Sequence, residues 1–285
     1  MIKPMKKLLL FVILIPFCTF AQNKPTPRSV VNQIKENVTC DWAEKTVDVF
    51  KAGNPDTEIK GIAVCMFADM RTLQKAVEMN CNFIITHEPV FYNHLDDTEA
   101  YANDPVYKEK RQFIEDHKLV VFRFHDHIHM TKPDGIYAGM IEKLGWKDYA
   151  VDDRGTLFKM PEIQLADFAQ ELKKQLGLQT VRVIGNPEMK FTKVGLAVGA
   201  PGGARQIQML NMPDVEVMVA GEANEWETYL YANDATTLGK NKAVIFVGHI
   251  KSEEAGMDYC AQWLKGFVKG VPIHFIENEA NFVTF

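Results

Sequence analysis

The chain has 285 residues and a formal net charge of −5, and 24% of its residues are charged. Lysine and arginine form no run of the kind that neutralises a phosphate backbone, which argues against a nucleic-acid partner. The length suits one large domain or two modest domains with a substantial hydrophobic core.

Residues 1–21 have the composition of a signal peptide. Three lysines precede an uncharged stretch from Leu8 to Phe17, and small residues favour cleavage after Ala21. The apolar stretch has about half of the roughly twenty residues that a membrane-spanning helix needs, which disfavours an uncleaved anchor. A lipoprotein attached at Cys18 ranks second, because the bulky Pro16 stands where such a signal has small residues. We expect an exported protein, periplasmic or secreted, with no stable membrane span after cleavage.

The rest of the chain alternates short β-rich runs with helical periods. Alternating strands and helices predict an α/β fold with a largely parallel sheet. We expect buried strands at residues 61–67, 83–86, 119–124, 194–198, 215–219 and 243–247. Residues 151–190 open with a polar stretch and contain an amphipathic helix, Leu165–Leu172, and they are interpreted as a connecting linker. This divides the chain into an N-terminal half, 22–150, and a C-terminal half, 191–285.

The second predicted strand ends at an imidazole next to a carboxylate. Pro89 prevents a helix there and biases Glu88 towards an extended conformation. Neighbouring side chains on an extended chain point in opposite directions, so His87 and Glu88 could reach two metal ions. A hydrogen-bonded histidine beside a solvated glutamate is the alternative.

Three histidines alternate after the third predicted strand. If the strand continued, His125, His127 and His129 would lie on one face, which is typical of a metal site. The turn signal Pro133–Gly135 follows soon afterwards, before a helix expected at Ile136–Leu144. A solvated histidine-rich loop is therefore the alternative.

The last predicted strand ends at Gly248, and a helix is expected to begin near Ser252. His249 and Glu253 are four residues apart, so a helical turn would put both on one face. An acidic residue at a helix start also complements the helix dipole, which is the simpler explanation for Glu253 and for Glu254.

Two further segments are weaker candidates. The glycine-rich segment at residues 198–204 could present backbone N–H groups to an anion, although turn glycines explain it more simply. Glu222 and Trp226 follow another predicted strand and could line the same cleft, although a capped helix start also explains the acidic residues there.

Together these segments resemble the NIF-three-like family, toroidal dinuclear-metal proteins that are homologous to GTP cyclohydrolase type 2. Ile85–Pro89 is similar to the family's Thr-His-His-Pro and Val219–Glu222 to its (Thr/Ser)-Gly-(Asp/Glu). Gly248–Glu253 matches its Gly-His-x-x-(Ser/Thr)-Glu, the most specific of the three motifs. The resemblance covers most of the mature chain and implies two α/β halves, with mostly parallel or mixed sheets and a metal site in the cleft between them.

The resemblance also implies the metal ligands, which are His87, Glu88, His129, His249 and Glu253. Glu88 stands where the family has a second histidine, and His129 stands where the family has the aspartate that ends His-Thr-Asn-Leu-Asp. The usual bridging carboxylate is then missing, so Glu88 or Glu253 would have to bridge.

Other site residues follow less directly. His125 matches the opening histidine of that motif, and we expect His125 or Glu254 to act as a general base or to support the ligands. The segment after His129 is one residue longer than the family pattern, which makes His127 a fallback ligand.

A pair of ions lowers the pKa of bridging water and stabilises the attacking and leaving oxygens of a displacement. The leading hypothesis is therefore a dinuclear-metal hydrolase of a small phosphoester, nucleotide-like or cyclic amide substrate. Histidine and carboxylate ligands suit zinc, iron, manganese or cobalt equally. The alternative is a non-catalytic metal-binding or metal-handling scaffold, and a single-zinc or metal-free binding module is a third reading. The family resemblance alone implies a homo-oligomer, a hexameric ring.

Overall fold

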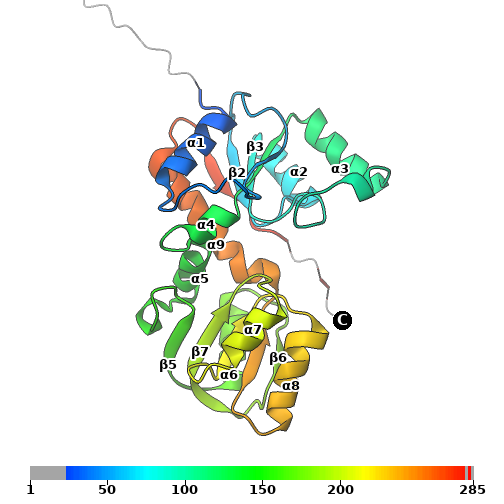
Figure 1. Cartoon of the computed structure of the whole chain (residues 1–285). Helices are drawn as coiled ribbons and strands as arrows, with labels where there is room; N and C mark the ends of the chain where they lie inside the picture. The colour runs from blue at the N-terminus through cyan, green and yellow to red at the C-terminus, as the bar shows by residue number, and fades with distance from the viewer. Residues whose placement is uncertain (1–23, 280–281, 284–285) are drawn as a thin grey trace, which may run out of the picture.

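The structure is a computed structural model that describes residues 24–279 and 282–283, so the predicted signal peptide lies outside the described residues. It has two α/β lobes, each built on a five-stranded sheet (Figure 1). The predicted α/β class with two halves is confirmed. No helix in the described part of the chain is long and apolar enough to span a bilayer.

The first lobe contains a sheet in the order β1-β4-β3-β2-β10. Strands β4, β3, β2 and β10 run parallel, and β1 is antiparallel to β4 at one edge. The strands are β1 Phe50–Ala52, β2 Ile62–Cys65, β3 Phe83–Thr86, β4 Val120–Arg123 and β10 Ile273–Phe275, and the helices are α1 Pro27–Asn37, α2 Met70–Glu78 and α3 Pro105–Asp116.

The central strands of this sheet are apolar because both of their faces are covered. Ile62 and Val64 of β2 share a core with α1, whereas Ala63 and Cys65 face the core that contains Leu73 of α2. Each of β2, β3 and β4 is buried along its whole length. Their predicted positions in the sequence are confirmed.

The second lobe contains a sheet in the order β5-β7-β8-β9-β6, with a parallel centre and antiparallel edge strands. Its strands are β5 Leu157–Gln164, β6 Arg182–Ile184, β7 Lys190–Ala197, β8 Val217–Ala220 and β9 Ala243–Phe246. Helix α6, Leu165–Gln175, packs on one face, and α7, Gly203–Leu210, and α8, Leu230–Thr237, cover the other.

The linker predicted for residues 151–190 is wrong, because this segment supplies β5, α6 and β6 to the second lobe. Both strands lie at the edges of the sheet. Along β5, Phe158 and Met160 are buried while Lys159 between them is exposed. An edge strand with one solvated face has this mixed composition, which is similar to that of a connecting segment.

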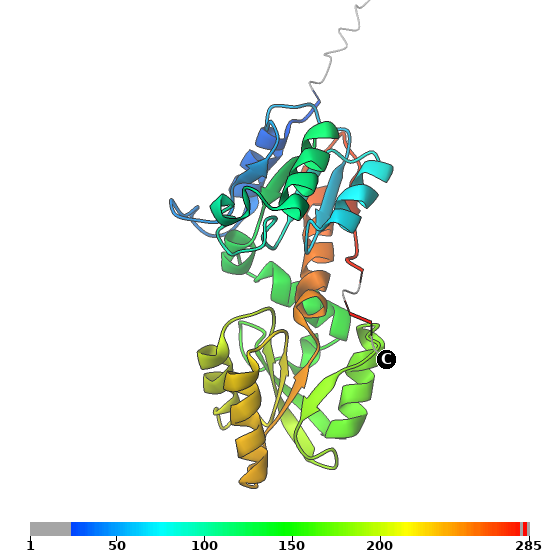
Figure 2. The same cartoon turned by 90° about the vertical axis from the view of Figure 1, so that its right-hand side faces the viewer.

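Three helices join the lobes: α4 Asp126–Met130, α5 Gly135–Leu144 and α9 His249–Phe267. Helix α9 leaves the second sheet after β9 and runs into the first lobe, where β10 completes the first sheet (Figures 1 and 2). Helices α5 and α9 pack closely, since a Cβ on Gly139 would lie 2.3 Å from the Ala255 oxygen. Short helices at Glu99–Tyr101 and Lys147–Tyr149 and a π-helix at Glu225–Tyr229 complete the described elements.

Candidate metal centre

The carboxyl ends of strands from both sheets supply the candidate site. His87 and Glu88 follow β3, and His125 follows β4, its parallel neighbour. His249 and Glu253 belong to the first turns of α9, which begins after β9 of the second sheet. Ligand sites in open α/β sheets commonly lie at the carboxyl ends of strands. The fold therefore brings segments that are far apart in the sequence to one place.

His87 has the environment of a metal-binding histidine. Its side chain is fully buried, and its Nδ1 lies 3.2 Å from the Phe124 carbonyl oxygen. A carbonyl only accepts, so Nδ1 holds the proton and Nε2 keeps its lone pair. This Nε2 is buried and has no hydrogen-bond partner among the described residues. Burial, together with nearby His129 and His125, holds the pKa of His87 well below its usual value, so the ring is neutral as metal binding requires.

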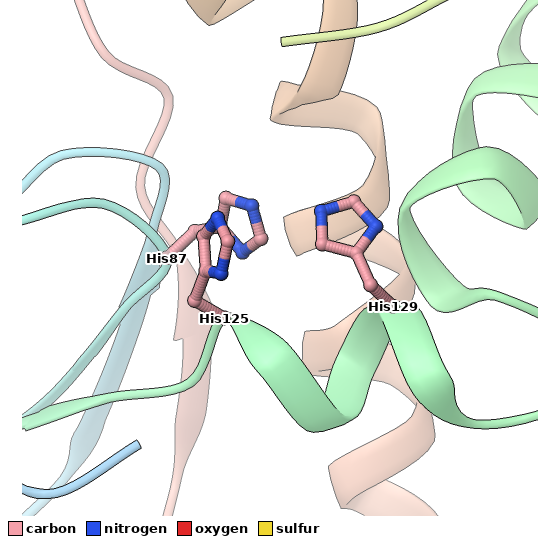
Figure 3. A group of neighbouring side chains, drawn as sticks. All are labelled: His87, His125 and His129. Atoms are coloured by element: carbon pink, nitrogen blue, oxygen red, sulfur yellow. The ribbon is translucent and has the colours of Figure 1, made fainter. Parts of the chain in front are cut away.

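Three more imidazoles are anchored in the same way. In each ring an acidic side chain lies beside Nδ1 and leaves Nε2 free to face the site, which is the usual arrangement of metal-binding histidines. The anchoring contacts are His125 to Asp126 at 2.9 Å, His129 to Asp134 at 3.0 Å and His249 to Glu222 at 3.1 Å. Figure 3 shows His87, His125 and His129 around one space, and ligand atoms of these three lie within 4.8 Å of one another.

Two buried carboxylates face these imidazoles. Glu88 Oε1 lies 3.1 Å from His249 Nε2 and 3.8 Å from His125 Nε2. Glu253 Oε2 lies 3.1 Å from His249 Nε2 and 3.7 Å from His87 Nε2. The other oxygen of Glu253, Oε1, is 3.9 Å from His129 Nε2. Every close contact of these oxygens with an imidazole is made through Nε2, so the six side chains converge.

Protonated His249 balances part of the negative charge of the carboxylates in the site. Burial opposes protonation of this ring, but hydrogen bonds with Glu222, Glu253 and Glu88 outweigh burial and raise its pKa to about 12. The carboxylates thus stabilise a cation at the His249 position. A divalent ion would take over this role and release the proton, because a metal-binding imidazole must be deprotonated.

The extended conformation considered for residues 125–129 is wrong, because α4 begins at Asp126. A helical turn puts His125 and His129 on one face and turns His127 to the opposite side. His127 Nδ1 lies 2.7 Å from Asp48 Oδ2, its Nε2 accepts a hydrogen bond from the Ala43 N–H at 2.9 Å, and its ring stacks on Trp42. Both nitrogens are therefore occupied, and the fallback ligand lies outside the cluster.

Glu254, a candidate base from the sequence, also points elsewhere. Its Oε2 accepts a hydrogen bond from Lys251 at 2.6 Å, and its Oε1 accepts one from the Asn278 backbone at 2.6 Å. Burial raises the pKa of this carboxyl. Glu254 fastens the C-terminal segment to α9, whereas Glu253 beside it turns towards the imidazoles.

Five of the six side chains line a pocket of about 750 Å³, to which residues of both lobes contribute. Trp226 is 74% exposed and does not line this pocket, so only Glu222 of the weaker pair contacts the site. The pocket is lined by Glu88, His94, His125, Asp126, His129, Met130, Tyr137, Val198, Ala200, Pro201, Arg205, His249 and Glu253. Arg205 is the only lysine or arginine of this lining.

The sequence did not reveal several supporting residues. Asp134 accepts hydrogen bonds from the first N–H groups of α5 and also anchors His129. The sequence indicates the first role, because aspartate is a common helix N-cap, but it does not indicate the contact with His129. Asp48 binds the backbone N–H groups of His125, Asp126 and His127 and thereby starts α4. Only the tertiary structure brings Asp48, which lies 77 residues before His125, to this position.

One glycine in the glycine-rich segment approaches the cluster closely. Gly199 has φ +64°, and a Cβ there would lie 2.2 Å from Glu253 Oε1. Its N–H donates to Ser252 Oγ at 2.9 Å, which ties the segment to α9. Gly199 thus leaves space for the Glu253 carboxylate and adopts a backbone conformation that favours glycine.

Comparisons with known proteins identify relatives of this chain. The curated GTP cyclohydrolase 1 type 2 homolog of Chlamydia trachomatis is 22% identical over 223 residues, 76% of this chain and 83% of the relative. The homolog of Deinococcus radiodurans is 24% identical over 228 residues, 77% of this chain and 80% of the relative.

Solved structures share the fold. A hypothetical protein of Staphylococcus aureus has a TM-score of 0.72 at 14% identity, covering 92% of this chain and 99% of that protein. A Bacillus cereus protein related to NIF3 also has a TM-score of 0.72 at 14% identity, covering 93% and 99%. The family model described as Duf34/NIF3 (NGG1p interacting factor 3) matches residues 26–281. The chain therefore belongs to the DUF34/NIF3 family.

Proposed function

We propose that this protein is a dinuclear-metal hydrolase whose ions are held by four imidazoles and two carboxylates. The observation that carries the proposal is the unpartnered, fully buried Nε2 of His87, which faces Glu253 and two further anchored imidazoles. A polar atom in this position costs free energy unless something binds it. A divalent ion would satisfy it.

The number of donors favours two ions over one. Six side chains converge: His87, Glu88, His125, His129, His249 and Glu253. Catalytic zinc sites use about three protein ligands per ion and leave a position for water, so six donors suit a pair. This arrangement makes His125 a ligand instead of the base expected from the sequence. The donors, which lack thiolate, suit zinc, iron, manganese or cobalt.

The open pocket favours catalysis over a purely structural role, because structural metal sites are closed. Five of the six donors line the pocket, namely Glu88, His125, His129, His249 and Glu253. Bound ions would supply hydroxide at neutral pH and stabilise charge on the reacting oxygens. The chain's own residues hold the donors in place, since Asp126, Asp134 and Glu222 each fix one imidazole.

The walls of the pocket indicate the class of substrate. Arg205 lies on the second-lobe wall, and it forms no ion pair within residues 24–279. An unpaired guanidinium beside a metal centre suits a phosphate or carboxylate group. Val198 and Pro201 offer apolar contacts on the same wall. We therefore favour the phosphoester or nucleotide-like substrate over the cyclic amide.

The first test is metal content per chain, measured by plasma mass spectrometry on untagged protein. Near two equivalents are expected in the native protein, and a marked loss is expected in His249→Ala and Glu253→Ala. His117→Ala, which changes an exposed histidine at the end of α3 and before the start of β4, is the matched control and should keep both ions.

Metal-loaded protein would then be screened against phosphomonoesters, phosphodiesters and nucleotides. Turnover that is lost in both site variants would support the hydrolase. Two tightly bound ions without turnover would instead support the metal-binding scaffold, for which light scattering after size-exclusion chromatography would test the proposed ring. One ion or none in the native protein would contradict the dinuclear site.

A further inference from the structure

Arg123 is a fully buried arginine directly beneath the proposed metal centre. It is the last residue of β4 and pairs with Thr86, the residue before His87. Burying a guanidinium is costly unless its charge and its N–H groups are matched. The groups that contact the Arg123 guanidinium therefore indicate the role of this residue.

Three of these partners belong to the segment that follows β3. Arg123 Nε donates to the His87 carbonyl oxygen at 3.1 Å, and Nη1 donates to the His94 carbonyl oxygen. Nη2 has no hydrogen-bond partner within the described residues, and it lies 3.6 Å from Glu88 Oε2. A shift of a few tenths of an ångström would close this contact into a charge-assisted hydrogen bond.

Further charges are arranged behind the guanidinium. Asp96 Oδ2 lies 3.8 Å from Arg123 Nη1 and 3.0 Å from Lys51 Nζ. The other oxygen of Asp96 accepts the Val90 and Phe91 N–H groups, each at 2.7 Å. Lys51 thus shares the charge of Asp96, which leaves Glu88 as the carboxylate available to Arg123.

We infer that Arg123 is a positioning residue that holds Glu88 by Oε2 and turns Oε1 alone towards the metal ions. This inference rests on the proposed metal centre. Oε1 faces His249 and His125, so one oxygen of Glu88 reaches the donors. Within the described residues Glu253 pairs with no lysine or arginine, and its two oxygens face different imidazoles. The two carboxylates therefore have unequal surroundings: Arg123 would restrict Glu88, whereas no lysine or arginine in the described part of the chain restricts Glu253.

The same guanidinium also fixes one wall of the pocket. By binding the His87 and His94 carbonyls it closes the segment from residue 87 to 94 over the end of the sheet. His94 lines the pocket, so a change at Arg123 reaches both the donor and the wall beside it. A lysine at position 123 would keep the positive charge, but it lacks the planar guanidinium group with which Arg123 reaches the His87 and His94 carbonyl oxygens and Glu88.

The test is a cobalt(II) titration of the metal-free protein, followed by the visible absorption bands that report coordination. In Arg123→Lys we expect one of the two ions to bind about tenfold more weakly, the usual cost of removing a group that orients a ligand. Glu88→Gln should weaken the same ion. The double variant should lose no more than Glu88→Gln alone, because Arg123 acts through Glu88.

Two controls separate positioning from general stability. Arg71→Lys changes an exposed arginine paired with Glu279 and should leave both cobalt affinities unchanged. Circular dichroism of each metal-free variant checks folding. If Arg123→Lys does not fold, Arg123→Gln takes its place, with the same tenfold loss expected because it removes the charge and the fork.

The outcomes distinguish this inference from the proposed function. Two ions bound equally well by native protein and by a folded Arg123 variant would overturn the role of Arg123 alone. Additive losses in the double variant would also overturn it. A native protein that binds no cobalt would overturn the metal centre itself and this inference with it.

Discussion

His249 and Glu253 lie one turn apart at the start of α9, with His249 Nε2 and Glu253 Oε2 separated by 3.1 Å. The same imidazole lies 3.1 Å from Glu88 Oε1, which comes from the first lobe. The His249 ring therefore contacts carboxylates from both sides of the pocket, and ions bound beside it would link the two sides.

Metal removal is expected to destabilise the folded protein. An ion at 100 times its dissociation constant adds about 2.7 kcal/mol to the free energy of unfolding. For a chain of this size that corresponds to a shift in Tm of roughly 5–10 °C. Calorimetry with and without a chelator measures the shift, and His87→Ala should abolish it. An equal Tm in both conditions would count against a bound ion.

Gly199→Ala is expected to damage the metal centre through sterics alone. The new Cβ would lie 2.2 Å from Glu253 Oε1, so the carboxylate has to move. The positive φ adds a backbone cost of about 1–2 kcal/mol. Gly145→Ala is the matched control, since Gly145 has φ +67° and no atom within 4 Å of the added Cβ. Both variants should lose stability, but only Gly199→Ala should lose metal, as plasma mass spectrometry can measure.

His127→Ala is expected to lower stability without changing metal content. The variant leaves Asp48 buried without its imidazole partner and removes the stacking on Trp42. Losing a hydrogen bond to a buried carboxylate costs about 1.5–3 kcal/mol. Urea unfolding gives the cost, and metal analysis of the folded protein gives the occupancy. Loss of one ion in well-folded His127→Ala would show that this histidine is a ligand after all.

Stability at alkaline pH is expected to depend on Lys110. This lysine is 4% exposed, and burial lowers its pKa from 10.5 to about 8. Below pH 8 the charged form of Lys110 lowers the stability of the folded state, because the ammonium group is buried there and solvated in the unfolded chain. Between pH 8 and 10.5 the folded protein releases the proton first, so the stability contribution of Lys110 rises with pH, by about 3 kcal/mol at most. Urea unfolding of native protein and Lys110→Met across this range should show the rise only in the native protein.

The sequence predicted the central strands and most of the side chains that converge at the candidate site, because both have local signatures. Apolar runs such as β3 are buried on both faces, and His249 with Glu253 has helical spacing. It misjudged residues 125–129, because alternating histidines are compatible with a strand and with a short helix. Asp48 decides between them by binding the first N–H groups of α4. This contact between distant segments leaves no pattern in the local sequence.

Supporting residues were harder to find for the same reason. In the sequence, Asp134 and Asp126 are typical acidic residues at the start of a helix. Only the structure shows that each also contacts the Nδ1 of a neighbouring imidazole. Arg123 has the sequence context of a strand residue, and its buried contacts depend on the loop after β3.

Helix α9 begins at the second sheet and ends in the first lobe (Figure 2). His249 and Glu253 therefore reach the site from the second lobe, whereas His87, Glu88 and His125 follow strands of the first lobe. His129 belongs to the connecting helix α4. Neither lobe carries a complete set, so cutting the chain between them would divide the centre. Ions bound here would act as a non-covalent staple, and a hinge motion that separated the lobes would have to break metal–ligand bonds. If the proposed ions bind, their occupancy would also be a measure of interlobe closure.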